Sequence, residues 1–135
     1  MAKTNDALTQ TVSSPLTKIS DTEYVEEYWW NKDLPNQKYP NPITTKTAVD
    51  AIFLAKLEEI TSKIEENKLP NSSYEHYRGF SECRVCHYQY NGAKEYKFVS
   101  GGVTYRYPEG LMHYYQQHNV QPSNKFYEAV MKLHV

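Results

Sequence analysis

Apolar side chains recur at three- and four-residue steps between residues 44 and 68, which is the spacing of one face of an α-helix. These positions are Val49, Ile52, Phe53, Leu57, Ile60 and Ile64. Charged residues lie between them, and Pro70 prevents the helix from continuing. The pattern predicts a long amphipathic helix over 44–68. We expect it to pack on the core of its own domain, because amphipathic helices usually do.

After the second cysteine, apolar and polar residues alternate with a period of two. Aromatic or apolar residues alternate with polar ones over 87–90, 94–99 and 103–107, as in strands that bury one face. Asn91-Gly92 and Gly101-Gly102 separate these runs, and both dipeptides favour tight turns. The sequence therefore predicts a three-stranded antiparallel meander.

Two short helices are predicted after the meander. Pro108 and Glu109 suit the first turn of a helix that ends near Asn119, a residue that tolerates the left-handed conformation. Ser123 is a candidate N-cap for the second helix. The apolar face of the second helix would consist of Phe126, Val130 and Leu133.

The N-terminal part is patterned differently. Residues 1–20 are polar and rich in Thr and Ser, which predicts a disordered or loosely held tail. Over 21–34, acidic residues precede Tyr24, Tyr28 and Trp29, which predicts a short helix. We expect the tail to be followed by a single domain, 21–135, with a helical part at 21–70 and a second part at 71–135.

The composition indicates that the fold needs stabilisation beyond its apolar core. The chain has 135 residues, enough for one domain, and its hydrophobic fraction is only 39%, while 13 Tyr, 4 Phe and 2 Trp concentrate apolar surface in rings. A small aromatic core of this kind gains from a metal site. The net charge of −1 offers no overall attraction to nucleic acid or an anionic membrane. With no signal-peptide pattern and no span-length apolar run, we expect a cytoplasmic protein.

The chemistry is concentrated in two pairs of residues. Cys83 and Cys86 form a C-x2-C pair, and His113 and His118 follow on the predicted helix. Two thiolates and two imidazoles are the donors of a tetrahedral structural Zn2+ site, so we predict that these four residues bind zinc and that 71–135 is the zinc-binding part. Positions five apart on an ideal helix lie about 140° out of phase. His118 must therefore lie where the last turn loosens.

Other interpretations of these residues remain open. The two pairs could be unrelated, or the cysteines could form a redox pair, although a β-rich stretch follows them and not the helix of a thioredoxin-like unit. Cys83 to His87 also matches the c-type haem attachment pattern, with Met112 or Met131 as axial partners, but that cofactor is normally attached after export.

A catalytic zinc site would differ in ligand number. It usually has three protein ligands, an open position for water and a nearby acid or base. Glu82 and Glu109 are near in sequence, yet Glu109 is explained by the first turn of its helix. We therefore favour a structural zinc and no catalytic or other cofactor-binding residues, and retain a metal-dependent hydrolase as an alternative.

Two kinds of partner fit the remaining side chains. The aromatic and acidic segment from Glu23 to Trp30 is a candidate contact for a protein, because Tyr and Trp dominate interface energetics. Tyrosines interleaved with basic residues on the sheet could instead stack the bases of single-stranded RNA or DNA. These tyrosines are Tyr88, Tyr90, Tyr96 and Tyr105. Since exposed rings are costly without a partner, we expect them to cover the core and favour the protein.

Residues 77–130 resemble a family of small microbial zinc-binding proteins. The shared pattern is a C-R-x-C knuckle, an N-G-x-x-E-Y hairpin and P-E-G-L-x-H-Y followed by a second His. Tyr107 stands where that pattern has Trp. The resemblance implies that Cys83, Cys86, His113 and His118 are the metal ligands, and it implies no activity. The sequence thus predicts an α+β domain built on a meander, a helix and one zinc, and a non-enzymatic module that binds a protein.

Overall fold

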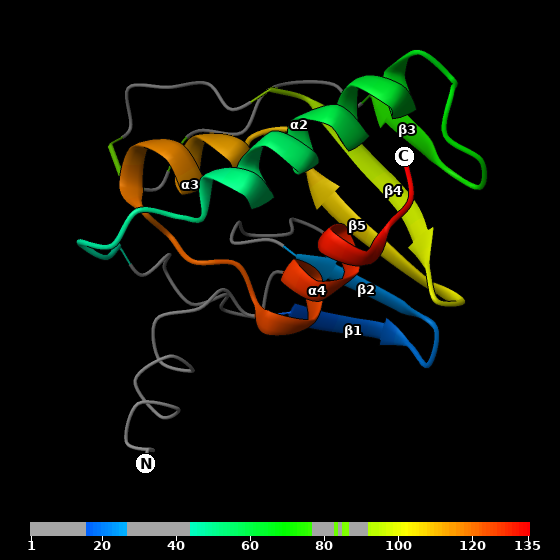
Figure 1. Cartoon of the computed structure of the whole chain (residues 1–135), viewed down its shortest axis with the longest axis horizontal. Coiled ribbons are helices and arrows are strands. Elements are labelled where there is room, and N and C mark those ends of the chain that lie inside the picture. The colour runs from blue at the N-terminus through cyan, green and yellow to red at the C-terminus, as the bar shows by residue number, and fades with distance from the viewer. Residues whose placement is uncertain (1–15, 27–43, 77–82, 84, 87–91) are drawn as a thin grey trace.

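The computed structural model describes residues 16–26, 44–76, 83, 85–86 and 92–135 (Figure 1). Eight elements lie in these ranges, five strands and three helices. In chain order they are β1 (Leu16–Ser20), β2 (Glu23–Glu26), α2 (Ala51–Glu65), β3 (Ser73–His76), β4 (Lys94–Ser100), β5 (Val103–Pro108), α3 (Leu111–His118) and α4 (Asn124–Lys132).

The strands form one five-stranded sheet in the order β1-β2-β5-β4-β3. All neighbours are antiparallel except β2 and β5, which run parallel. The α+β class is therefore confirmed, but a five-stranded mixed sheet stands in place of the predicted three-stranded meander. The hairpin of β4 and β5 is present, with Gly101 and Gly102 at φ 60° and 77° in its turn. The predicted strand at 87–90 lies outside the described residues.

The N-terminal segment differs most from the prediction. Residues 23–26, which we expected in a helix, form β2, and residues 16–20, which we placed in the tail, form β1. Tyr24 stacks on Tyr105 of β5 with ring centroids 6.1 Å apart, and Lys125 of α4 lies 4.4 Å above the Tyr24 ring. A short aromatic segment is compatible with the residue spacing of a helix or of a strand. Pairing with β5 favours the strand here. Residues 27–34 of the predicted helix are not described.

The long helix predicted over 44–68 is also not matched. Helix α2 begins at Ala51, where the Asp50 carboxylate accepts a hydrogen bond of 3.0 Å from the Ile52 N–H as an N-cap. The segment before it binds the chain after α3. Thr45 Oγ1 donates to the Asn119 carbonyl at 2.7 Å, and Asn119 Nδ2 donates to the Thr45 carbonyl at 3.2 Å. These bonds satisfy backbone groups that a longer helix would have used.

The core is a stack of aromatic rings between the sheet and helices α2 and α4, which lie over one face of the sheet (Figure 1). Fully buried rings come from every part of the core: Phe53, Tyr96, Phe98, Tyr114, Tyr115 and Phe126. Phe126 of α4 lies 6.1 Å from Phe98 and 5.7 Å from Tyr107 between ring centroids. Aromatic packing of this kind offsets the low count of aliphatic residues.

A buried carboxylate ties the C-terminal helices to the sheet. Glu26 of β2 is 0% exposed. Its oxygens accept hydrogen bonds from the Ser123 N–H at 2.8 Å, from Ser123 Oγ at 2.7 Å and from the Tyr115 hydroxyl at 3.1 Å. Ser123 in turn accepts a hydrogen bond from the Phe126 N–H as the N-cap of α4, as predicted. Glu26 therefore sets where α3 ends and α4 begins relative to the sheet.

None of the described helices has the length and apolar character that crossing a membrane requires.

Candidate metal centre

The first half of the Cys/His group is the turn that carries Cys83 and Cys86. Cys83 is buried and Cys86 is half-buried. The N–H groups of Val85 and Cys86 lie 3.4 and 3.5 Å from Cys83 Sγ and donate to it. These two N–H groups fix the position of the Cys83 sulfur within the turn, as the ligand atom of a metal site requires.

The second half is the C-terminal end of α3. His118 is its last residue, and Asn119 adopts the left-handed conformation at φ 51°. The Asn119 N–H bonds to the Tyr114 carbonyl, a step of five residues and not the four of an α-helix. His118 thus lies at the point where the helix ends, and its ring centroid lies 5.0 Å from that of His113. The sequence predicted a loosened turn here, and the Asn119 geometry confirms it.

The ligand atoms of the two halves converge. Cys83 Sγ lies 3.4 Å from His118 Nε2, and Cys86 Sγ lies 3.6 Å from His113 Nε2. One ligand atom from each of the four residues lies within 4.8 Å of all the others. A tetrahedral Zn2+ with ordinary bond lengths separates sulfur from nitrogen by about 3.6 Å. The group therefore fits a tetrahedral metal ion, and within the described ranges no other group of this kind is found.

The electrostatics of the imidazoles suit metal binding. Burial lowers the pKa of His113, and the neighbouring His118 lowers it further. A lowered pKa keeps the ring neutral near pH 7, and the neutral ring is the form that donates a lone pair to a metal.

The framework around the group is more buried than the ligands themselves. Tyr114 and Tyr115, which lie between the two histidines in sequence, are each 0% exposed. They pack α3 into the aromatic core, while the bonds between Thr45 and Asn119 hold the chain at its end. Ligands held this way need little reorganisation to bind an ion.

Glu109 has a role that the sequence did not predict. Pro108 is the last residue of β5 and α3 begins at Leu111, so neither Pro108 nor Glu109 lies in the first helical turn. Glu109 Oε1 instead accepts hydrogen bonds from the N–H groups of Ala93 and Lys94, at 3.0 and 3.2 Å. Gly92, at φ 90°, passes so close that a Cβ there would collide with this carboxylate. Glu109 therefore ties the start of β4 to the end of β5.

The other candidate residues are dispersed. Glu82 and His87 lie outside the described residues. Met112 and Met131, the conceivable haem ligands, pack half-buried against the core, while His76 and His134 are exposed. Tyr96 and Tyr105 are 1% and 5% exposed, so these rings belong to the core as expected; Tyr88 and Tyr90 are not described.

The role of Glu26 was not predicted from the sequence, because its local pattern is that of a surface residue. An acidic residue beside Tyr24 and Tyr28 looks like the solvated side of an amphipathic segment. Its partners, Tyr115 and Ser123, lie about ninety residues further along the chain. No local pattern signals such a pairing.

The model of one protein family, described as a domain of unknown function (DUF7919), matches residues 36–131. The match covers more than half of the chain and includes α2, the strands β3 to β5, α3 and all four members of the Cys/His group. No curated protein and no solved structure matches the chain.

Proposed function

The chain belongs to the DUF7919 family, and we propose that it is a non-enzymatic module that a structural Zn2+ stabilises and that binds a protein partner. The zinc part of this proposal rests on the convergence of Cys83, Cys86, His113 and His118. Zinc suits this donor set best, because two thiolates and two imidazoles in tetrahedral spacing are its usual structural ligands. A reducing compartment such as the cytoplasm would keep both thiols available.

A structural role is favoured over hydrolysis by the number of ligands. Four side chains complete a tetrahedral shell and leave no position for water, which a hydrolytic zinc must bind and activate. Glu109, the nearest sequence candidate for a catalytic acid or base, is engaged with the backbone of Ala93 and Lys94. The chemistry that the ion supplies here is therefore cross-linking of the 83–86 turn to α3.

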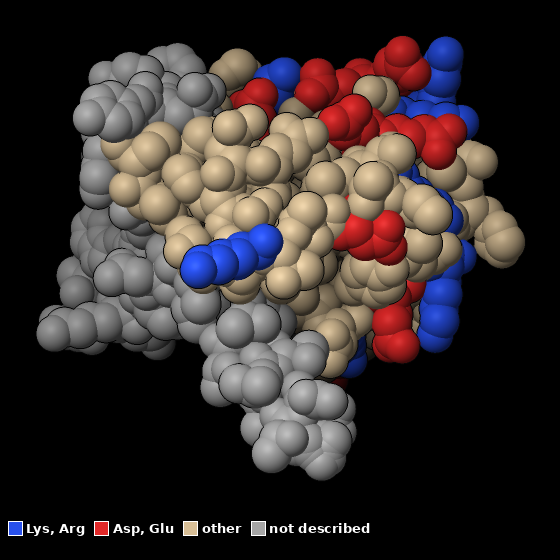
Figure 2. Space-filling view, turned by 60° about the vertical axis from the view of Figure 1, so that its left-hand side comes forward, with Lys and Arg blue, Asp and Glu red and all other residues tan. Residues whose placement is uncertain are grey.

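A protein partner is favoured over a nucleic acid by the surface. Tyr96, Tyr105 and Tyr107 are buried and cannot stack on bases. Figure 2 shows a broad uncharged area, with acidic side chains mainly along its top and basic ones toward the right-hand edge. At one edge of the sheet, all four residues of β3 are exposed, and its outer side pairs with no strand in the described part of the chain. Such an edge suits an added peptide strand.

The segment assigned to the partner is only partly buried in the structure. Within Glu23 to Trp30, Val25 and Glu26 are buried in β2, whereas Glu23 and Tyr24 are half-buried. Tyr28, Trp29 and Trp30 lie outside the described residues and remain candidates by their chemistry.

The zinc part of the proposal is tested on protein purified without added metal. We expect one zinc per chain, and Co2+ in its place should give a tetrahedral S2N2 spectrum that does not titrate with pH. His118→Asn should weaken metal binding strongly, whereas His76→Asn, which replaces an exposed histidine outside the group, should not. A stable fold that binds no metal would refute the proposal of a structural zinc.

The partner half is tested with the full chain as bait, in its metal-bound form. A double Trp29→Ala, Trp30→Ala variant should lose a partner that the parent protein binds with measurable affinity, with unchanged zinc content and melting temperature. A variant that melts earlier yet keeps the partner would mean that the two rings serve the fold and not the contact.

A further inference from the structure

The chain directly after His118 is bonded to a segment far away in the sequence. Thr45, which lies 74 positions before Asn119, donates from its Oγ1 to the Asn119 carbonyl at 2.7 Å. Asn119 Nδ2 donates back to the Thr45 carbonyl at 3.2 Å. Both residues are half-buried. The Thr45–Asn119 pair therefore holds Asn119 at two points, its backbone carbonyl and its side-chain amide.

Further hydrogen bonds reinforce this pair. Gln121 Nε2 donates to the Thr47 carbonyl at 2.7 Å and lies 3.5 Å from Thr45 Oγ1. The Thr47 N–H donates to the same Thr45 Oγ1 at 3.2 Å. Residues 45–47 and 119–121 are therefore joined by several hydrogen bonds, most of which involve Thr45, and bonds that share groups in this way support one another.

His118 needs such support because it is the last residue of α3. Helix ends fray, since their last carbonyl groups have no partner within the helix. Yet His118 Nε2 lies 3.4 Å from Cys83 Sγ, and a metal site tolerates deviations of only about 0.2 Å in its ligand distances. The position of His118 therefore depends on how the residue after it is held.

Apolar packing alone would hold this end of α3 less precisely. Val120 is 0% exposed and anchors the chain just after Asn119 in the core. Apolar contacts tolerate small rotations of the backbone, whereas a hydrogen bond weakens steeply as its angle falls. Asn119, at φ 51° and ψ 35°, lies between His118 and Val120, where such a rotation would occur.

We infer that Thr45 and Asn119 are positioning residues of the candidate metal centre, which act through the backbone of His118; this inference rests on the proposed zinc site. The chain before α2 thus belongs to the metal centre, although none of residues 44–47 is among the four grouped ligands. Such a coupling is reciprocal, because the factor by which the pair tightens metal binding equals the factor by which a bound ion stabilises the pair. Occupancy of the site therefore also governs the order of the segment that leads into α2.

Two substitutions in the full-length chain remove the bonds of the pair one at a time. Thr45→Val keeps the shape of the side chain but loses the hydroxyl that donates to Asn119, and Asn119→Gly loses the amide but readily adopts the left-handed conformation. We expect each to weaken zinc binding about tenfold in competition with a chelator of known affinity, the lower end of the effect of groups that orient metal ligands. In Co2+-saturated protein, each should also shift the tetrahedral absorption bands.

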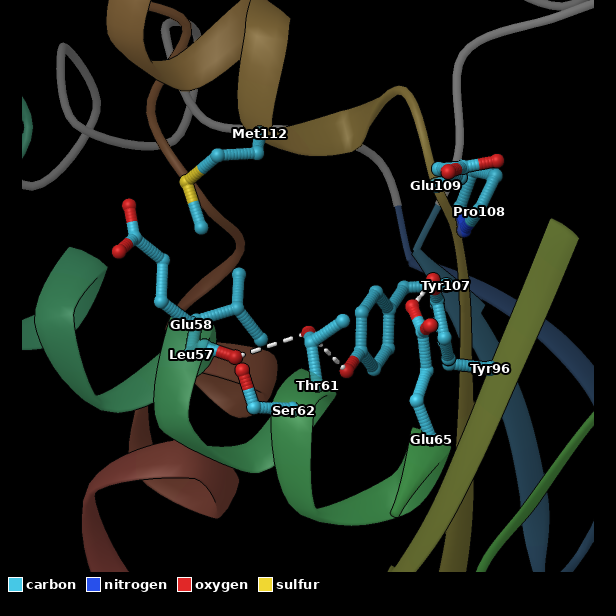
Figure 3. Close-up of a pocket in the computed structure, with 10 residues that line it drawn as sticks. All are labelled: Leu57, Glu58, Thr61, Ser62, Glu65, Tyr96, Tyr107, Pro108, Glu109 and Met112. Carbon is cyan, nitrogen blue, oxygen red and sulfur yellow. Dashed lines mark hydrogen bonds between the residues drawn. The ribbon is translucent and has the colours of Figure 1, made fainter. Parts of the chain in front are cut away.

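Matched controls are needed because folding and metal binding are coupled, so any loss of stability lowers the apparent affinity. Thr61→Val removes a hydroxyl that donates to the Leu57 carbonyl at 2.9 Å and bonds the Tyr107 hydroxyl at 2.7 Å (Figure 3). Thr61 lines a pocket beside α2 whose lining includes three glutamates and no member of the Cys/His group. Thr61→Val therefore removes equivalent hydrogen bonds away from the metal centre.

Asn67→Gly is the control for the second substitution. Asn67 follows α2 in the left-handed conformation, at φ 59°, and is exposed. The change thus replaces an asparagine of the same backbone conformation after a different helix. At an equal loss of stability, measured by urea unfolding, both controls should bind zinc more tightly than the Thr45→Val and Asn119→Gly variants, and both should keep the Co2+ spectrum of the parent protein.

A conservative variant completes the test. Thr45→Ser restores the hydroxyl and should recover most of the affinity that Thr45→Val loses. The inference is overturned if Thr45→Val and Asn119→Gly bind zinc as tightly as controls of equal stability and keep the parent spectrum, or if Thr45→Ser binds as weakly as Thr45→Val. A parent protein that binds no metal would refute the zinc proposal as well, so the metal content of the parent separates the two failures.

Discussion

The candidate metal centre and the aromatic core meet at the same helix but differ in how they would hold it. In the core, Phe53, Phe98 and Phe126 are 0% exposed and are stabilised by burial of apolar surface. In the candidate metal centre, three of the four Cys/His side chains are half-buried, and their proximity would allow them to coordinate one ion. Packing tolerates many ring arrangements, whereas coordination requires four atoms at one point. A small domain can thus use an ion where apolar surface is scarce.

Helix α3 joins the two regions. Tyr114 and Tyr115 face the core, while His113 and His118 face the cysteines. Loss of either region should therefore loosen the other through α3.

Removing a ligand should break the metal centre completely. Cys83→Ser replaces a buried sulfur, and we expect loss of the ion and a fall of more than about 5 kcal/mol in the free energy of unfolding, because metal binding contributes directly to folding. Metal analysis and thermal unfolding with and without a chelator measure both effects. His76→Asn serves as the control. A variant that melts like the parent protein would show that the core needs no metal.

Removing a buried ring should destabilise the aromatic core. Phe126→Ala removes a ring that contacts Phe98, Tyr105 and Tyr107, and we expect a loss of about 3–5 kcal/mol. Urea unfolding measures it, with Glu128→Ala, an exposed change on the same helix, expected within about 0.5 kcal/mol of the parent. Below its transition the variant should still bind Co2+ in tetrahedral form. If it does not, the metal centre depends on the core more than coordination alone explains.

Neutralising the buried anchor should weaken the link between sheet and helices. Glu26→Gln keeps the shape but replaces one acceptor oxygen by an NH2 group that faces donors from Ser123 and Tyr115. We expect a loss of about 1–3 kcal/mol, the cost of buried donors without an acceptor. Glu59→Gln is the matched exposed control. Equal stability of the two variants would mean that α3 and α4 are held by ring packing alone.

The smallest effect concerns pH. The Tyr96 hydroxyl, and to a lesser extent Lys94, hold the pKa of Glu65 below its ordinary value of 4.5. A lowered folded-state pKa means that this stabilisation is present above about pH 4.5 and is lost as pH falls through the folded-state pKa. Tyr96→Phe should raise the Glu65 pKa toward 4.5 and flatten the decline of stability in acid.

A 13C carboxyl titration followed by NMR measures that pKa directly. Tyr74→Phe changes the neighbouring exposed ring and should leave it unaltered. An unchanged Glu65 pKa in Tyr96→Phe would assign the shift to Lys94 instead.

Local signals explain which parts were predictable. The glycines at 101–102 specified the β4–β5 turn, Ser123 capped α4, and Asn119 ended α3, because each acts on the backbone within a few residues. The grouping of Cys83, Cys86, His113 and His118 was predicted because their chemistry and spacing restrict where they can meet.

The sequence by itself thus determined the α+β class, the hairpin, the C-terminal caps and the four residues that could hold an ion. Tertiary structure alone decided that residues 23–26 form a strand parallel to β5, that Glu26 is buried beneath α3 and α4, and that an acidic pocket opens beside α2. The physical reason is distance along the chain. A turn or cap is favoured by its own residues, whereas strand partners, buried acids and pockets exist only when remote segments meet.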